Sequence, residues 1–326
     1  LRLITEHTEG FDVKKQLSKW EKYDMDAFVP ARSTEPFRKI EESWKELDQY
    51  IYTAIQYLPL PLQKEALDKI KEIDHPVIPS FSKNAQSVPS TPWQVALLKD
   101  GRLKIEGLFY QMYDHNDYAH YLDNYLRARH GWALDDIGKP GLDKSKAVGV
   151  SLPAQVIKKE IRKDKKGIQT VSELVFPLRP EVDQRVYPER MYADVLEYKN
   201  GKKVEVTLTI QEKPAVRLPE AYWLSFNTAD ILSIFAEKIG ERVDLLDVVE
   251  KGNRQQHGID RYVDLVTSAG TIRIWSEAAF LVNIGEAKGI NYSWEYPDKQ
   301  GGIHFNLSNN LWNTNFCMWN EGSLSY

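Results

Sequence analysis

The spacing of apolar residues changes along this chain, and that change limits the folds it can adopt. After Ser33 and Thr34, either of which can cap a helix, apolar residues recur at alternating intervals of three and four from Phe37 to Leu58. This spacing is typical of one face of a helix packed in a bundle. Beyond residue 100, apolar residues more often alternate with polar ones, as they do in a half-buried strand. The sequence therefore predicts a helical part followed by a β-rich part.

The helical part is predicted to contain two or three antiparallel helices. Pro59 and Pro61 end the long apolar stripe, and a similar pattern follows them as far as Ile73. A weaker version precedes the stripe, from Val13 to Trp20. We interpret the stripe as core, and we expect residues 1–75 to form a helical bundle segment.

Prolines and serines interrupt the periodic pattern over residues 76–92, which predicts a linker. Residues 93–326 are predicted to be a β-rich, sandwich-like domain with short helices. The expected fold class is α+β, with an N-terminal antiparallel helical bundle followed by a β-rich domain of sandwich type. The predicted strands are Leu103–Phe109, Val204–Ile210, Thr271–Ile284 and Gly302–Leu307, and the predicted short helices are Tyr118–Arg129 and Ala229–Ile239.

Composition excludes several classes of protein. A mean hydropathy of -0.49 and the lack of a long apolar run exclude a membrane-spanning helix, and 42% hydrophobic residues exclude general disorder. With 43 Lys and Arg against 47 Asp and Glu, the net charge of -4 does not fit a nucleic-acid binder. We therefore expect neither a membrane nor a nucleic acid as a partner.

The single cysteine, Cys317, excludes an intrachain disulfide and a thiolate zinc cluster. We interpret it as a core residue, because it lies among aromatic residues. A lone cysteine slightly favours the cytoplasm, although secretion stays open. The sequence begins at Leu1, in an apolar stretch without methionine, and we expect it to be part of something larger.

His7 is the best candidate metal ligand among the seven histidines. It follows an apolar stretch and precedes Gly10, and loops at strand ends are common places for binding sites. A lone histidine in such a loop is nevertheless more often structural, so the local pattern leaves both interpretations open.

A second histidine cluster contains His115 and Asp117. A His-x-Asp pair can hold a metal, but Asn116 or Asp117 is equally well placed to cap the helix that follows. The histidine at position 257 is interpreted as part of a turn. The sequence contains neither a Walker phosphate-binding loop nor a Gly-x-Ser-x-Gly nucleophile elbow. The many tryptophans and tyrosines permit carbohydrate binding, but they also suit a β core.

Four stretches carry a resemblance to a known family: residues 6–14, 138–142, 213–226 and 310–319. In order and spacing along nearly the whole chain, they resemble the C-terminal half of proteins with a domain of unknown function numbered 5054. Those proteins in turn resemble the α-mannosidases of glycoside hydrolase family 38. In such enzymes a metal-bearing α/β domain precedes a helical bundle and β-rich domains.

The resemblance implies a zinc-dependent, retaining glycoside hydrolase that acts on carbohydrate. His7 matches the last zinc ligand of that family, which comes from the segment entering the bundle. Glu6, Glu9 and Asp12 would lie beside the metal or face the substrate. Glu9 stands where the family usually has tryptophan, which changes the charge and shape expected there.

The catalytic nucleophile and the other zinc ligands of the family have no counterpart in this sequence. An N-terminal α/β catalytic domain, or a companion chain that carries it, is therefore the expected partner. Alone, the chain is expected to be inactive. The alternative hypothesis is a non-catalytic carbohydrate-binding or structural module.

Overall fold

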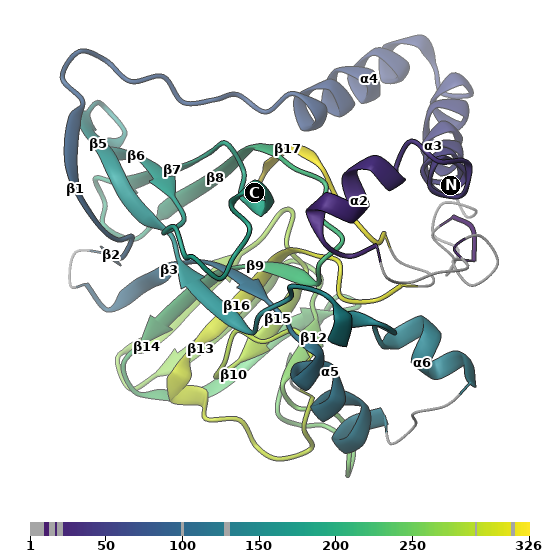
Figure 1. Ribbon diagram of the computed structural model, residues 1–326. Coiled ribbons are helices and arrows are strands. Elements are labelled where there is room, and N and C mark those ends of the chain that lie inside the picture. Colours follow the sequence, from purple (N-terminus) through teal and green to yellow (C-terminus); the bar gives the residue numbers. More distant parts are fainter. Residues whose placement is uncertain are drawn as a thin grey trace.

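The computed structural model describes residues 10–12, 17, 22–98, 101–126, 131–290, 292–313 and 317–326. Within these ranges the protein is mostly β-structure, arranged as three antiparallel sheets (Figure 1). The helices are α2 (Met25–Ala31), α3 (Glu35–Gln56), α4 (Leu60–Asp74), α5 (His115–Tyr121) and α6 (Gly131–Ile137), with short helical turns η1 (Leu122–Leu126), η2 (Leu142–Lys144), η3 (Gln184–Val186) and η4 (Lys299–Gly301). Figure 1 shows α3 and α4 to one side of the sheets, with α5 and α6 near another edge.

The largest sheet, sheet B, has seven strands. Its order is β12 (Gln256–Gly258), β15 (Leu281–Ile284), β16 (Ile303–Asn309), β9 (Glu220–Thr228), β3 (Leu103–Met112) and β2 (Val95–Leu97), and β4 (Val150–Pro153) also pairs with β3. The central pairing of β3 with β9 runs from Leu103 opposite Thr228 to Met112 opposite Glu220. Sheet B supplies wall residues to both cavities described below.

Sheet A has six strands in the order β1 (Gln86–Pro92), β5 (Gln155–Lys163), β6 (Gly167–Val175), β7 (Arg190–Tyr198), β8 (Val204–Lys213) and β17 (Gly322–Ser325). β1 lies inside the segment predicted as a linker and pairs with β5. Pro89 and Pro92 are compatible with this strand because β1 is at the edge of the sheet, where one side needs no backbone donor.

Sheet C has the order β11 (Glu241–Asp244), β10 (Ile231–Lys238), β13 (Tyr262–Thr267) and β14 (Gly270–Trp275). β10 occupies most of the segment Ala229–Ile239, so the prediction of a short helix there is wrong. A short apolar run has no periodicity that separates a buried strand from a helix, and here pairing with β11 and β13 decides in favour of the strand. The strands predicted around β3, β8 and β16 are confirmed.

The three sheets share one hydrophobic core. It contains inward-facing residues of sheet A such as Val195, of sheet B such as Leu224 and Phe305, and of sheet C such as Leu265. Sharing one core gives the β-rich part its sandwich-like character.

The predicted antiparallel helical bundle is wrong. α3 buries Phe37, Ile40, Ser43 and Ile55, whereas no side chain of α4 is buried. Leu60 and Ile73 of α4 remain 78% and 71% exposed. Because α4 buries no side chain, α3 and α4 do not form a hydrophobic core between them. The fold is therefore a β-rich structure with a short helical N-terminal region.

Trp319 attaches the helical region to the β-structure. Its ring lies 5.0 Å from Phe28, 5.7 Å from Phe37 and 4.8 Å from Trp44, measured between ring centroids. These aromatic rings form a second hydrophobic cluster that also includes Ile40. The N-terminal half of the α3 stripe therefore packs against a C-terminal segment of the chain, not against another long helix.

The buried residue Asn310 joins the segment Val216–Glu220, Met318 and Lys139 through its side chain and its backbone. Its side-chain Oδ1 atom accepts the Glu220 N–H at 2.7 Å, and its backbone carbonyl oxygen accepts a hydrogen bond from Lys139 Nζ at 2.7 Å. Its Nδ2 group donates to the carbonyl oxygens of Val216, Leu218 and Met318 at 2.7, 3.0 and 3.2 Å. Because Asn310 is 2% exposed, water cannot replace these bonds if the side chain is lost.

We expect Asn310→Ala to lower the free energy of unfolding by about 3 kcal/mol, because three carbonyl groups and one N–H would be left buried without this partner. Urea denaturation monitored by tryptophan fluorescence measures the change. Asn84→Ala, at an exposed position, is the matched control and should be close to neutral. Equal stability of the two variants would contradict the assigned role of Asn310.

Candidate functional site

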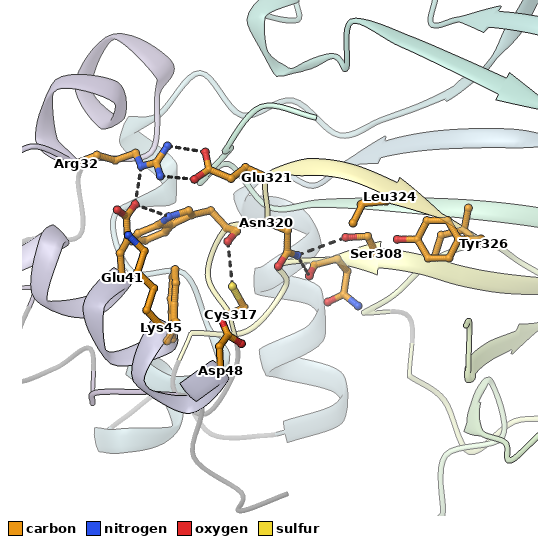
Figure 2. Close-up of a pocket in the computed structure, with 14 residues that line it drawn as sticks. Arg32, Glu41, Lys45, Asp48, Ser308, Cys317, Asn320, Glu321, Leu324 and Tyr326 are labelled. Atoms are coloured by element: carbon orange, nitrogen blue, oxygen red, sulfur yellow. Dashed lines mark hydrogen bonds and ion pairs between the residues drawn. The ribbon is translucent and has the colours of Figure 1, made fainter. Parts of the chain in front are cut away.

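A cleft of about 600 Å³ lies between α3 and the C-terminal strand β17 (Figure 2). We call it the α3–β17 cleft. Its walls come from the helical region, the end of β16 and the C-terminal segment: Arg32, Glu41, Trp44, Lys45, Asp48, Leu307, Ser308, Asn309, Cys317, Trp319, Asn320, Glu321, Leu324 and Tyr326. A cavity of this size is in the range of small-molecule sites.

An arginine with two carboxylate partners fixes one wall of the cleft. Arg32 donates from both terminal nitrogens to Glu321, at 2.8 and 2.6 Å, and from Nε to Glu41 at 2.6 Å. Glu41 also accepts the Trp319 indole N–H at 3.0 Å. The guanidinium group holds the pKa of Glu321 below its usual range. This network fixes the carboxylate groups relative to the aromatic rings, as Figure 2 shows.

Trp44 connects the cleft with the start of the described chain. The Phe11 N–H donates to Ser43 Oγ at 3.0 Å. Gly10, at φ +74°, lies so close to α3 that a Cβ there would be 2.6 Å from Trp44 Cδ1. A residue with a side chain would be strained and would clash, so Gly10 allows this segment to pack against the wall residue Trp44.

Neutral polar groups line the opposite side of the cleft. Asn320 Nδ2 donates to Ser308 Oγ at 3.3 Å and to the Asn309 carbonyl oxygen at 3.2 Å. Burial raises the pKa of Tyr326, although a hydrogen bond with Ser308 opposes the shift. Cys317, predicted to be a core residue, is half-buried and lines the cleft, where its Sγ donates to the Trp319 carbonyl oxygen at 2.9 Å. Aromatic, amide, hydroxyl and carboxylate groups therefore meet in one cavity.

Asp48 is the carboxylate of the cleft whose proton affinity is raised. Partial burial raises its pKa, and the nearby carboxylate of Asp74 on α4 raises it further. The side chain is still largely exposed, which limits the size of the effect. Asp48 is therefore a group that a ligand in the cleft can reach.

Most of the residues that the sequence assigned to a metal site cannot be compared with the structure. His7, Glu6 and Glu9 lie outside the described residues. Asp12 is described and is half-buried, just after the contact of Phe11 with Ser43.

The second histidine cluster forms the start of α5. Asp114 caps the helix, its Oδ1 accepting the N–H groups of Asn116 and Asp117 at 2.8 and 3.1 Å. Asp117 accepts the Asp114 N–H in return and pairs with Lys288 at 3.0 Å. His115 is the exposed first residue of the helix. The Asp117 carboxylate thus takes part in a capping box at the start of α5 and in an ion pair with Lys288.

The described side chains do not by themselves fit a zinc ion. Within the ranges given above, no three His, Cys, Asp or Glu side chains are grouped so that they could hold a metal. A catalytic zinc needs about three protein ligands, so any such site requires ligands from outside these ranges.

Sequence reasoning did not find the α3–β17 cleft. Trp44 belongs to the apolar stripe that was interpreted as core, and Arg32, Glu41 and Glu321 have no motif around them. The one available signal was the cluster of tryptophans near the C-terminus, which suits both a core and a sugar-binding surface.

Comparison with known proteins gives one family match. Residues 1–103, from the N-terminus to the start of β3, match the family described as "Domain of unknown function (DUF5054)". No curated protein and no solved structure matches the chain. Of the described helices, none is long and apolar enough to cross a membrane.

We expect Asp48→Asn to raise the free energy of unfolding at neutral pH. A carboxyl group whose pKa is higher in the folded state favours folding when it is protonated, and this contribution is lost as pH rises through the folded pKa. The variant removes that loss. Its advantage over the wild type should therefore disappear at about pH 3, where the wild-type Asp48 carboxyl group is mostly protonated in both the folded and the unfolded state.

Urea titrations at the two pH values measure this difference. Asp68→Asn, on the exposed face of α4, serves as the matched control. An advantage of Asp48→Asn that is the same at both pH values would contradict the raised pKa.

Proposed function

We propose that this chain is the helical and β-rich portion of a glycoside hydrolase-like enzyme, similar to the α-mannosidases of glycoside hydrolase family 38. The α3–β17 cleft is the part of the carbohydrate site that this chain contributes. The observation that carries the proposal is the packing of Gly10, three residues after His7, against Trp44 in the cleft wall. Gly10, which follows the candidate metal ligand closely in sequence, thus borders a cavity whose aromatic and polar lining suits a sugar.

The lining of the cleft supports this role. Aromatic rings offer apolar faces to a sugar ring, while amide and carboxylate groups exchange hydrogen bonds with its hydroxyl groups. Trp44 and Tyr326 supply the rings, and Asn320 and Asp48 supply polar groups on opposite walls. These residues bind and orient the sugar, whereas the catalytic nucleophile comes from the N-terminal α/β domain or companion chain.

In a retaining glycoside hydrolase, two carboxyl groups act as nucleophile and as acid/base. Zinc, when bound, would hold sugar hydroxyl groups next to the scissile bond. In this proposal His7 supplies one zinc ligand and the partner supplies the others, with Glu6, Glu9 and Asp12 beside the metal. The described residues do not form the zinc site, so their role in this proposal is to bind and orient the sugar.

We expect His7→Ala to reduce the zinc content of the complete assembly, since one ligand of the site would be lost. Atomic emission spectroscopy of the purified assembly measures zinc per chain. His75→Ala, at an exposed position after α4, is the matched control and should retain full zinc. Unchanged zinc in His7→Ala would overturn the metal assignment without affecting the cleft.

The second candidate function is a non-catalytic carbohydrate-binding module. It is favoured by the cleft itself, whose aromatic and polar lining needs no metal. The two functions differ in one respect: a module binds glycans as an isolated chain and without zinc.

We expect the chain to bind oligosaccharides from a panel that includes mannose-terminated glycans, and Trp44→Ala to weaken that binding by about tenfold or more. Isothermal titration calorimetry with and without a chelator measures affinity and metal dependence. Asp48→Asn, in the same cleft, should also weaken binding, and it leaves the core intact because Asp48 is exposed. Trp275→Ala, an exposed tryptophan on β14, is the matched control. Silence across the panel, also in the presence of the partner, would overturn both carbohydrate functions.

A further inference from the structure

A row of polar side chains crosses sheet B. Ser225, His304, Asn283 and Gln256 stand directly opposite one another in the register of β9, β16, β15 and β12. Their strand neighbours point to the other face of the sheet, where they join the core. Ser225, Asn283 and His304 are 1%, 1% and 8% exposed and Gln256 is half-buried, so the row is a polar surface with three buried members.

A loop covers one end of the row. Asn283 Nδ2 donates to the Lys288 carbonyl oxygen at 2.7 Å, and Gln256 Nε2 donates to the Gly289 carbonyl oxygen at 3.3 Å. The Tyr292 hydroxyl group donates to Gln256 Oε1 at 2.7 Å. At this end the polar groups therefore have protein partners.

The other end of the row opens into a cavity of about 410 Å³, which we call the β16 pocket. Ser225 and His304 line it together with residues of β3, of β4 and of the glycine-containing turns: Glu106, Phe109, Gln111, Ser151, Asn227, Gly285, Glu286, Ala287 and Gly301. Among these lining residues, the charged groups are the carboxylates of Glu106 and Glu286, and none is a lysine or an arginine.

His304 and Ser225 form a hydrogen-bonded pair in the wall of the pocket. His304 Nδ1 lies 2.8 Å from Ser225 Oγ, while Nε2 is buried without a hydrogen bond. Burial lowers the pKa of His304 to about 4, opposed by the nearby backbone groups of Gly285 and Gly301, so the ring is neutral at physiological pH. The donor and acceptor roles in the pair of His304 and Ser225 depend on which ring nitrogen carries the proton.

With the proton on Nε2, Nδ1 accepts the hydroxyl proton of Ser225, and with the proton on Nδ1 the Ser225 oxygen accepts one hydrogen bond from the ring. In both cases the Ser225 oxygen keeps a lone pair that can accept a hydrogen bond from a molecule in the pocket. Glu106 and Glu286 add carboxylate acceptors, and Phe109 adds an aromatic ring. The pocket thus offers acceptors and an apolar face without a positive charge.

We propose that the β16 pocket binds one uncharged, hydroxyl-rich ring of monosaccharide size. Hydroxyl groups donate to Ser225 and to the two carboxylates, and the ring packs against Phe109. A phosphorylated sugar is disfavoured because the carboxylates repel it and no lining side chain neutralises it. The pocket shares no lining residue with the α3–β17 cleft, so this inference does not rest on the proposed function.

Isothermal titration of the full chain with D-mannose, D-glucose, D-galactose and D-glucose 6-phosphate tests the proposal. We expect saturable binding of at least one neutral sugar and none of the phosphorylated one. Ser225→Ala should weaken binding about tenfold through loss of the acceptor. Glu106→Ala, at a half-buried position in the pocket wall, should weaken binding too, and it decides the test if Ser225→Ala does not fold.

Asp68→Asn, at an exposed position on α4 outside both cavities, is the control and should leave this binding unchanged. Binding that survives both pocket variants but is lost in Asp48→Asn or Trp44→Ala would place the sugar in the cleft and overturn this inference while leaving the proposed function intact. Absence of binding to all three neutral sugars, or binding of the phosphorylated sugar as tight as that of D-glucose, would also overturn it.

Discussion

The hydrogen bonds of Asn310 are the constraint on which much of this structure depends. Its side chain connects the segment before β9, the start of β9 and the C-terminal segment. Its backbone carbonyl oxygen accepts a hydrogen bond from Lys139. Close by, the buried pair of Lys213 and Glu220, 2.6 Å apart, joins the end of β8 to the start of β9. Removing one member of such a network leaves buried polar groups without partners, which costs far more than an exposed bond.

This polar network explains what three of the four stretches with a family resemblance do in the fold. Residues of the stretches 138–142, 213–226 and 310–319 meet in it, although they are far apart in sequence. The C-terminal stretch also carries Trp319, against which α3 packs. The same segment therefore closes the β-structure, holds the helical region and forms a wall of the α3–β17 cleft.

Both cavities border β16, one at each end of the strand. Leu307, Ser308 and Asn309 belong to the α3–β17 cleft, whereas His304 belongs to the β16 pocket. The cleft contains two basic residues, Arg32 and Lys45, and the lining of the pocket has carboxylates as its charged groups. Arg32 is already paired with Glu41 and Glu321, so the cleft differs from the pocket in offering Lys45 as a basic group beside its carboxylates.

Local patterns were enough to predict the α3 helix, several strands such as β3 and β16, and a helix start near Asn116 and Asp117, although the capping residue is Asp114. The sequence by itself determined these elements because periodicity and capping act over a few residues. Only the tertiary structure decided that the α3 stripe packs on Trp319 instead of forming a bundle, that residues 231–238 are a strand, and that Arg32 meets Glu321. Each of these depends on contacts between residues distant in sequence, where strand pairing, burial and charge pairing override local preference.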